Sequence, residues 1–230
     1  IPNNHFEHPT NNGVCAVYIR PLNSNKGFIL TNNHSETLNV GIDAIKYVLN
    51  ALDKIYVRDK KEFLHYFVLQ KLFDITLTSP TYIPDRTTSH QYFYYKYPSK
   101  EDVNRIVPIV KHYEYCENIF NDLKNRINEP INNFYNDKAT VVFNAVERSG
   151  IRIDRDRFKS YFYDECNEYV YTQYNFKTLT TRPANKFNGI NYAALNKDNG
   201  CRTSFIPRND KFVELDISAY HPTLLGLLVG

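Results

Sequence analysis

The stretch Lys54-Ile-Tyr-Val-Arg-Asp59-Lys-Lys-Glu62-Phe-Leu-His-Tyr-Phe-Val-Leu-Gln70 decides the fold class of the N-terminal part of this chain. Its first five residues have β-branched and aromatic side chains at their centre, which favours a short strand. Asp59 followed three residues later by Glu62 is typical of a helix start and predicts a helix over residues 60–70. A strand that runs directly into a helix indicates an α/β domain.

Two further elements are predicted before this stretch. Residues 13–20 and 28–30 are apolar and rich in β-branched side chains, and the turn Asn23-Ser-Asn-Lys-Gly27 between them predicts a β-hairpin. Residues 41–52 predict an amphipathic helix. The apolar side chains of this helix recur at helical spacing: Ile42, Ile45, Leu49 and Leu52. Strands and helices therefore alternate along the N-terminal region.

The composition changes at about Pro80. Residues 79–98 are rich in Pro, Thr and Tyr, which is typical of a connecting loop. Ser99 with Asp102 predicts the start of a long helical stretch, interrupted near Pro108, that ends at about residue 128.

A second helix is predicted between Pro130 and Gly150, because glycine suits the position just after a helix end. Its expected apolar stripe consists of Ile131, Phe134, Ala139, Val142, Phe143 and Val146. Residues 151–153 are then expected to be extended, and Asp154 to cap a third helix that runs to about residue 169.

The C-terminal part differs in character. Residues 178–207 are polar, rich in Asn and irregular, whereas Lys211-Phe-Val-Glu-Leu-Asp-Ile217 has the composition of a strand. Pro222 stands where the first turn of a helix could begin. Asp216 is therefore expected at the C-terminal end of a strand, before a turn into a helix, which is a common position for a metal-binding carboxylate.

The composition sets broad limits on function. Hydrophobic residues make up 42% of the 230 and charged residues 23%, as is typical of a globular protein. A net charge of +3 is compatible with a nucleic-acid partner without identifying one. No apolar run approaches the roughly 20 residues of a membrane span, so no membrane partner is expected. The four cysteines form no C-x-x-C pair, which argues against a zinc site or a disulfide framework and favours a cytoplasmic location.

Two groups of residues resemble family A, or polymerase I-like, DNA polymerases. The first is Glu147-Arg-Ser-Gly-Ile-Arg-Ile-Asp154, which is similar to the E-x-x-G-I-x-I-D turn that opens the polymerase domain of that family. The second is an ordered set that ends in motif A: Thr180-Thr-Arg182, Asn191, Gly200-Cys-Arg-Thr-Ser-Phe205 and Asp216-Ile-Ser-Ala-Tyr-His221. The order of these elements and the interval between Arg and Phe agree with the family pattern.

The resemblance implies an α/β and α+β fold in two parts. Residues 1–98 would form a ribonuclease H-like 3′–5′ exonuclease-type domain. Residues 99–230 would form the start of the polymerase domain, with thumb-base helices, a primer-template loop and the first palm strand. The implied function is that of a component of a template-directed DNA polymerase, which transfers a nucleotide from a dNTP to a primer 3′-hydroxyl by two-metal-ion catalysis.

The resemblance also assigns site residues. Asp216 and the backbone carbonyl of Ile217 would bind Mg²⁺, a hard cation that prefers oxygen ligands, as part of a two-ion site. Tyr220 and His221 would meet the sugar of the incoming nucleotide. The remaining assigned residues would bind primer-template DNA: Arg182, Asn191 and Arg202.

The chain departs from the family pattern in several respects. His221 replaces a glutamate that gates the sugar, and Thr223 replaces an arginine. Motifs B and C, with the second metal-binding carboxylate, are not among these residues, so a C-terminal segment or a second chain is expected to supply them. The exonuclease D-x-E pair is also missing, so the N-terminal domain is expected to be degenerate, with Glu114 and Glu117 on a solvated helix face.

Two other functions fit parts of the pattern. One is a non-catalytic DNA-binding or assembly subunit that retains the polymerase fold. The other is a relative of single-subunit RNA polymerases, which share a similar motif A carboxylate, although the spacing from Gly200 to Phe205 favours a DNA polymerase. The chain contains no Met and stops within an apolar segment, so both of its ends are expected to be cut or processed.

If Asp216 anchors Mg²⁺, Asp216→Asn should abolish nucleotide incorporation by the completed enzyme. Affinity for primer-template DNA should stay nearly unchanged, because the substitution removes only the charge that holds the metal ion. Primer extension and DNA binding measured side by side check this expectation. Incorporation at the normal rate by the variant would contradict it.

Overall fold

The computed structural model describes residues 1–4, 7–78, 101–102, 105–162, 167–176, 183–185, 190–216 and 226–227. The chain divides into a larger unit, Ile1–Gly150 with Tyr171–Ala194, and a smaller unit, Ile151–Val170 with Leu195–Gly230. The architecture is mixed α/β, as predicted, with the described strands arranged in two-stranded pairs. The predicted loop 79–98, and with it the predicted domain boundary after residue 98, lies outside the described residues.

The predicted N-terminal hairpin is confirmed. Strand β1 (Ala16–Ile19) pairs antiparallel with β2 (Phe28–Thr31), and Ala16 lies opposite Thr31. A Cβ atom at Gly27 would meet the end of the Tyr18 ring, so a larger residue there would have to displace this ring where the chain enters β2. A 3₁₀ turn, η1 (Pro9–Asn11), precedes the hairpin.

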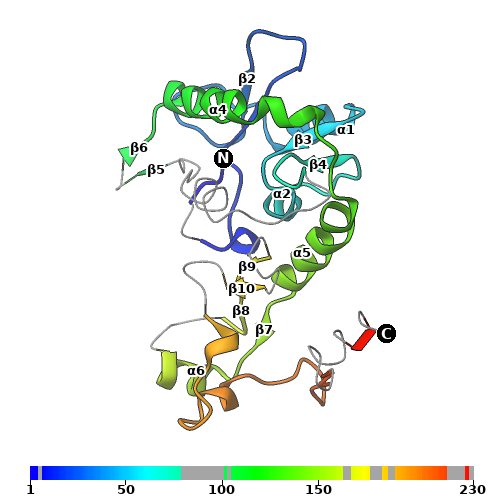
Figure 1. Ribbon diagram of the computed structural model, residues 1–230. Coiled ribbons are helices and arrows are strands. Elements are labelled where there is room, and N and C mark those ends of the chain that lie inside the picture. The colour runs from blue at the N-terminus through cyan, green and yellow to red at the C-terminus, as the bar shows by residue number, and fades with distance from the viewer. Residues whose placement is uncertain are drawn as a thin grey trace. The chain divides into compact units, whose positions relative to one another are not determined.

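The stretch after the hairpin forms a parallel strand–helix–strand unit. Strand β3 (Ile55–Val57) pairs in parallel with β4 (Leu72–Asp74), and helix α2 (Lys60–Tyr66) connects them (Figure 1). The Asp59 carboxylate accepts a hydrogen bond of 3.0 Å from the backbone N–H of Glu62, which is the predicted cap. Helix α2 ends four residues earlier than predicted, because Phe67 takes an extended conformation and is buried in the core.

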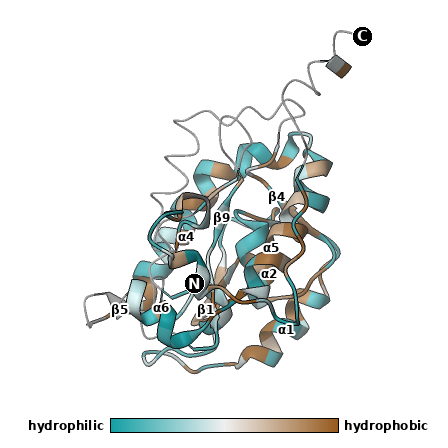
Figure 2. Ribbon diagram, turned by 90° about the horizontal axis from the view of Figure 1, so that it is seen from below, coloured by the Kyte–Doolittle hydropathy of each residue, from teal (hydrophilic) through white to brown (hydrophobic). Residues whose placement is uncertain are grey.

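Apolar side chains from the hairpin and two helices form the core of the larger unit. The predicted first helix is α1 (Ile42–Asn50). The main core cluster consists of Val14, Val17, Ile45, Leu49 and Phe67, and a second one of Val57, Leu64 and Leu72. Figure 2 shows both hydrophobic and hydrophilic stretches on the helix ribbons, as expected of amphipathic helices that cover a core.

The helix predicted from residue 99 begins later. Residues 101–102 form β5 (Glu101–Asp102), which pairs antiparallel with β6 (Arg105–Ile106). Helix α4 (Ile109–Leu123) starts directly after Pro108 and continues as the 3₁₀ turn η2 (Lys124–Asn128). Pro108 explains the difference, because a proline disfavours helical geometry in the residue before it while suiting a helix start.

The second predicted helix exists, but its buried face coincides only in part with the expected apolar stripe. It begins as a π-helical turn, η3 (Phe134–Ala139), continues as α5 (Thr140–Ser149), and stops at Gly150, whose φ is 63°. Three residues of the expected apolar stripe are exposed: Phe134, Val142 and Val146. The buried residues are polar: Asn136, Thr140, Asn144 and Glu147. The stripe was wrong for these three residues, because buried polar partners on α2 fix the orientation of this helix, while the other three are partly buried.

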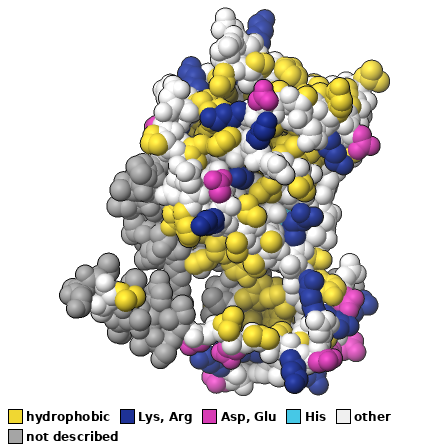
Figure 3. All heavy atoms as spheres, turned by 90° about the vertical axis from the view of Figure 1, so that its right-hand side faces the viewer, with side chains coloured by type: hydrophobic (Ala, Val, Ile, Leu, Met, Phe, Trp, Pro, Cys, Tyr) yellow, Lys and Arg dark blue, Asp and Glu magenta, His cyan; other side chains and the backbone are white. Residues whose placement is uncertain are grey.

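Hydrophobic side chains consequently gather on the surface of the larger unit. Figure 3 shows such side chains interspersed with Lys and Arg side chains on one face of the molecule. Among the exposed hydrophobic residues are Val141, Val142 and Val146 of α5. The larger unit also contains the short strands β9 (Tyr174–Asn175) and β10 (Ala184–Asn185), which pair antiparallel, and the 3₁₀ turn η4 (Tyr192–Ala194).

The smaller unit is built around α6 (Arg155–Phe162). Strand β7 (Ile151–Arg152) lies in the predicted extended segment and pairs antiparallel with β8 (Tyr169–Val170). The predicted helix to residue 169 was too long, since Tyr169 pairs with Arg152 in this ladder. The 3₁₀ turn η5 (Cys201–Ser204) completes the unit.

The strand predicted over residues 211–217 is not formed in its described part. Residues 211–216 have no strand assignment and all are exposed, including Leu215 at 92%. The residues of this segment have high β-propensity, but propensity alone does not make a strand. The backbone N–H and C=O groups of a strand need a neighbouring strand, and the described residues supply none here.

Removing the cap at Asp59 should weaken the larger unit. Asp59→Ala leaves the N–H of Glu62 without its side-chain acceptor, so we expect the free energy of unfolding to fall by about 1 kcal/mol. Urea unfolding followed by circular dichroism measures the change. Asp53→Ala is the matched control, because the Asp53 side chain is fully exposed and lies 3.6 Å from an exposed Lys71 amine. An equal loss in both variants would contradict a capping role.

Candidate functional site

Two segments that carry the polymerase resemblance meet in the smaller unit. The residue pair Ile153 and Phe205 forms a β-bridge, although the two are far apart in the sequence. The backbone N–H of Asp154 donates to the carbonyl of Ser204 at 2.8 Å. The N–H of Ile206 donates to the carbonyl of Arg152 at 3.0 Å. The turn ending in Asp154 and the segment from Gly200 to Phe205 therefore form one junction, which we call the motif junction.

Side chains on both segments stabilise the motif junction. Asp154 caps α6, with its carboxylate accepting from the N–H of Arg157 at 3.2 Å. Phe158 is fully buried and stacks on Phe162 with ring centroids 4.5 Å apart, while Phe205 meets the Phe158 ring edge-on at 6.0 Å. This aromatic contact gives the Phe of the predicted Gly-to-Phe segment a packing role.

Gly200 begins the second segment for a conformational reason. Its φ of 76° lies in the left-handed region, which costs other residues energy. A Cβ atom at this position would also lie 2.9 Å from the hydroxyl oxygen of Tyr161. Glycine is therefore required both for the backbone turn and for the close approach of α6.

The predicted DNA-binding residues are only partly described. Arg202 is exposed on η5, where one guanidinium nitrogen donates to the carbonyl of Leu195 at 3.0 Å. Asn191 is exposed in the larger unit, and its carbonyl accepts from the N–H of Ala194 at 3.0 Å. Arg182 lies outside the described residues. Their DNA-binding roles stay predictions.

The predicted metal and nucleotide site is likewise only partly described. Asp216 is exposed, and the described residues place no hydrogen-bond or ion-pair partner beside its carboxylate. Ile217, Tyr220 and His221 lie outside the described residues. Across the described ranges, no group of three or more His, Cys, Asp or Glu side chains is placed to hold a metal ion. Of the predicted metal-site residues, the structure describes only Asp216, whose carboxylate could supply a hard oxygen ligand.

A buried polar cluster in the larger unit escaped the sequence analysis. The Glu147 side chain on α5 is fully buried and forms an ion pair with the amine of Lys61 on α2. Its second oxygen accepts from Nε2 of His65 at 2.8 Å. The backbone N–H of Tyr174 donates to the first oxygen at 2.6 Å. We call these residues the Glu147 cluster.

His8 extends the Glu147 cluster toward the N-terminal segment. Its ring meets the His65 ring edge-on, with centroids 5.4 Å apart, and stacks on Tyr171. The N–H of Thr10 donates to Nδ1 of His8, so the proton is on Nε2, which donates to the carbonyl of Thr172 at 3.2 Å. Both nitrogens of this ring are therefore engaged in holding the fold.

The charge states in the Glu147 cluster follow from its surroundings. Burial raises the pKa of Glu147, but the hydrogen bond from His65 and the positive charge of Lys61 outweigh burial, and the pKa lies below its usual value. Burial and the neighbouring His65 lower the pKa of His8 to about 4. At neutral pH, Glu147 is thus charged and His8 is neutral.

The Glu147 cluster acts as a structural element, because its reactive atoms are enclosed. The side chains of His65 and Glu147 are fully buried, so no substrate reaches them. One signal in the sequence could have indicated this cluster. Lys61 and His65 are four residues apart and therefore lie on one face of the helix. The prediction for α5 relied on its apolar residues and therefore did not include the polar residues that this helix buries.

Other carboxylates in the larger unit are also used structurally. The carboxylate of Asp74 is buried and accepts from the N–H of Lys60 at 3.0 Å and from the hydroxyl of Thr76 at 2.6 Å. Glu117 was expected on a solvated face, but its side chain is 18% exposed and pairs with Arg20. The prediction for Glu117 was wrong because the hairpin packs over this side of α4. Glu114 is exposed, as predicted.

Comparison of the chain with models of known protein families, with curated protein sequences and with solved structures finds no match. In the described part of the chain, no helix combines the length and the apolar character needed to cross a bilayer.

Replacing Glu147 by Gln should destabilise the larger unit strongly. Glu147→Gln leaves the buried amine of Lys61 without its counter-charge, which costs about 3–5 kcal/mol of unfolding free energy. A carboxylate with a lowered pKa stabilises the fold above its usual pKa of 4.5 and loses this effect as the pH falls. The wild-type protein should therefore lose stability below pH 4.5 more steeply than the variant.

Urea unfolding at several pH values measures both effects. Glu114→Gln is the control, because Glu114 is exposed and pairs only with Lys111, three residues away on the same helix. An effect of Glu147→Gln no larger than that of Glu114→Gln would show that the buried ion pair does not matter for stability.

Proposed function

We propose that this chain is a component of a template-directed DNA polymerase of family A. One observation carries the proposal: the segment around Asp154 and the segment from Gly200 to Phe205 form the motif junction. Each segment resembles this family in its sequence, independently of their contact. Segments that were similar by chance would have no reason to meet through two backbone hydrogen bonds and a β-bridge.

The geometry of Arg202 supports a DNA-binding role in this proposal. Its guanidinium lies at the surface of the smaller unit and keeps donor groups in addition to the one bonded to Leu195. Arginine at such a position can bind phosphates or base edges. Primer-template DNA is accordingly the proposed partner, contacted by Arg182, Asn191 and Arg202, with a dNTP as the second substrate.

The catalytic part of the proposal rests on Asp216. As an exposed carboxylate it can bind Mg²⁺ in the manner that the family resemblance implies. Two bound Mg²⁺ ions would stabilise the negative charge that develops during phosphoryl transfer. Because the described residues form no group of three or more potential metal ligands, we propose that a C-terminal segment or a second chain provides the second metal-binding carboxylate. We place the reaction in the cytoplasm.

The N-terminal region is proposed to be a degenerate exonuclease-like domain with a structural role. The carboxylates of Asp59, Asp74 and Glu117 all accept hydrogen bonds from neighbouring protein groups. Carboxylates used in this manner hold elements in place. We therefore expect no metal-dependent removal of primer 3′ ends by residues 1–98.

A second candidate function is a DNA-binding or assembly subunit without catalysis. The described residues form no group of three or more potential metal ligands, and this observation favours it. The two functions share DNA binding and differ in whether Asp216 matters. Dependence of primer extension on Asp216, in the presence of Mg²⁺ and the completing segment, distinguishes them.

Binding of labelled primer-template DNA, measured by fluorescence anisotropy at several salt concentrations, tests the shared part of the proposal. Arg202→Ala should weaken binding about three- to tenfold and reduce the slope of log affinity against log salt by about one. Lys46→Ala on α1 is the control, because the Lys46 amine lies exposed beside Asp43. Equal affinities of wild type and Arg202→Ala would contradict the proposed contact.

A further inference from the structure

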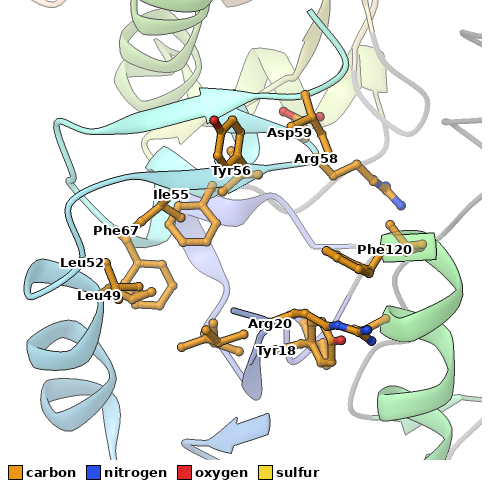
Figure 4. A pocket seen from close by; sticks show the side chains of 18 of the residues that line it. Tyr18, Arg20, Leu49, Leu52, Ile55, Tyr56, Arg58, Asp59, Phe67 and Phe120 are labelled. Carbon is orange, nitrogen blue, oxygen red and sulfur yellow. The ribbon is translucent and has the colours of Figure 1, made fainter. Parts of the chain in front are cut away.

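The larger unit encloses an apolar pocket of about 410 Å³. The hairpin, β3, α1, α2 and α4 all contribute to its walls, as Figure 4 shows for a part of them. Its hydrophobic lining includes Val17, Leu49, Leu52, Ile55, Phe67 and Phe120. The volume and the mostly apolar lining are typical of sites for small molecules.

Arginine side chains mark one end of this pocket. Arg20 from the end of β1 and Arg58 from the end of β3 both line it, and in Figure 4 both extend toward α4. The Arg20 guanidinium lies over the Phe120 ring, 4.5 Å from its centroid. The ring thus holds the guanidinium against the apolar wall.

Arg20 retains an unsatisfied donor. One terminal nitrogen donates to the Glu117 carboxylate, but Nε is buried and has no hydrogen-bond partner among the described residues. Buried donors are nearly always paired, so an orphan at the wall of a pocket indicates a missing acceptor. Because the Nε–H belongs to a charged group, an anionic acceptor would make the strongest bond.

Glu117 does not supply this acceptor. Burial raises the pKa of Glu117, but hydrogen bonds from Tyr18, from the N–H of Gly27 and from Arg20 outweigh burial, and the pKa lies below its usual value. The carboxylate is therefore charged and already engaged. The Gly27 N–H donates to it at 3.1 Å.

We propose that this pocket binds a small amphiphilic monoanion, such as a medium-chain carboxylate. The anionic group accepts the Nε–H of Arg20 near Arg58, and the hydrocarbon part lies against Leu49, Leu52 and Phe67. An amine of the same length is disfavoured, because the basic residues that line the pocket (Arg20, Lys54 and Arg58) outnumber the acidic ones (Asp59 and Glu62). This inference is independent of the proposed polymerase function.

Isothermal titration calorimetry of the full chain with octanoate tests the proposal, with octylamine as the probe of opposite charge. We expect saturable binding of one octanoate per chain and at least tenfold weaker binding of octylamine. Arg20→Lys keeps the charge opposite Glu117 but removes the Nε donor, and should weaken octanoate binding about tenfold. Arg155→Lys on α6 is the matched control and should bind like the wild type, because Arg155 is exposed and does not line the pocket.

A second variant keeps the test decisive if Arg20→Lys does not fold, as judged by circular dichroism. Leu52 lines the pocket and is 38% exposed, so Leu52→Trp can fill space there with little effect on the buried core. Loss of octanoate binding in this variant supports the proposal. The proposal is overturned if octanoate shows no saturable binding, if octylamine binds equally well, or if octanoate binds Leu52→Trp as it binds the wild type.

Discussion

The buried carboxylate of Glu147 is the constraint on which the larger unit depends. A charge in the protein interior is tolerated only where partners replace the lost water, and here Lys61, His65 and the N–H of Tyr174 do so. These partners belong to α2 and to β9, so one carboxylate fixes the rotation of α5 against both. The polar face of α5 is inside for this reason, although apolar packing alone would have turned the helix the other way.

The smaller unit is organised on a different principle. Its two chain segments are joined by backbone hydrogen bonds and by the stacked rings of Phe158, Phe162 and Phe205, with no buried charge among its described residues. This arrangement leaves its charged side chains, Arg202 among them, at the surface. Such a unit can present charged groups to a partner without disturbing its own core.

The sequence predicted those elements whose structure depends only on residues close together in the chain. The hairpin, α1, the Asp59 cap and the stop at Gly150 depend on turn chemistry and on spacing within one element, and all four were predictable. The orientation of α5 and the strand at residues 211–217 were not, because they depend on partners elsewhere. Lys61 is 86 residues from Glu147 in the sequence, and no local pattern indicates which of two helix faces will meet it. For the candidate site, the two segments of the motif junction were named from the sequence, whereas their contact and the Glu147 cluster required the structure.

The contact between His8 and Thr172 has a consequence for how the protein is made. These residues are 164 positions apart, and the segment 151–170 between the two parts of the larger unit belongs to the smaller one. A ribosome that adds about 5–20 residues each second needs on the order of ten seconds between these two positions. During that interval the N-terminal segment waits without its partner. Contacts of such long range also slow folding in general, because a large loop must close before they form. Synthesis rate and chaperone supply should therefore influence the yield of folded protein more than they do for a chain whose units are continuous.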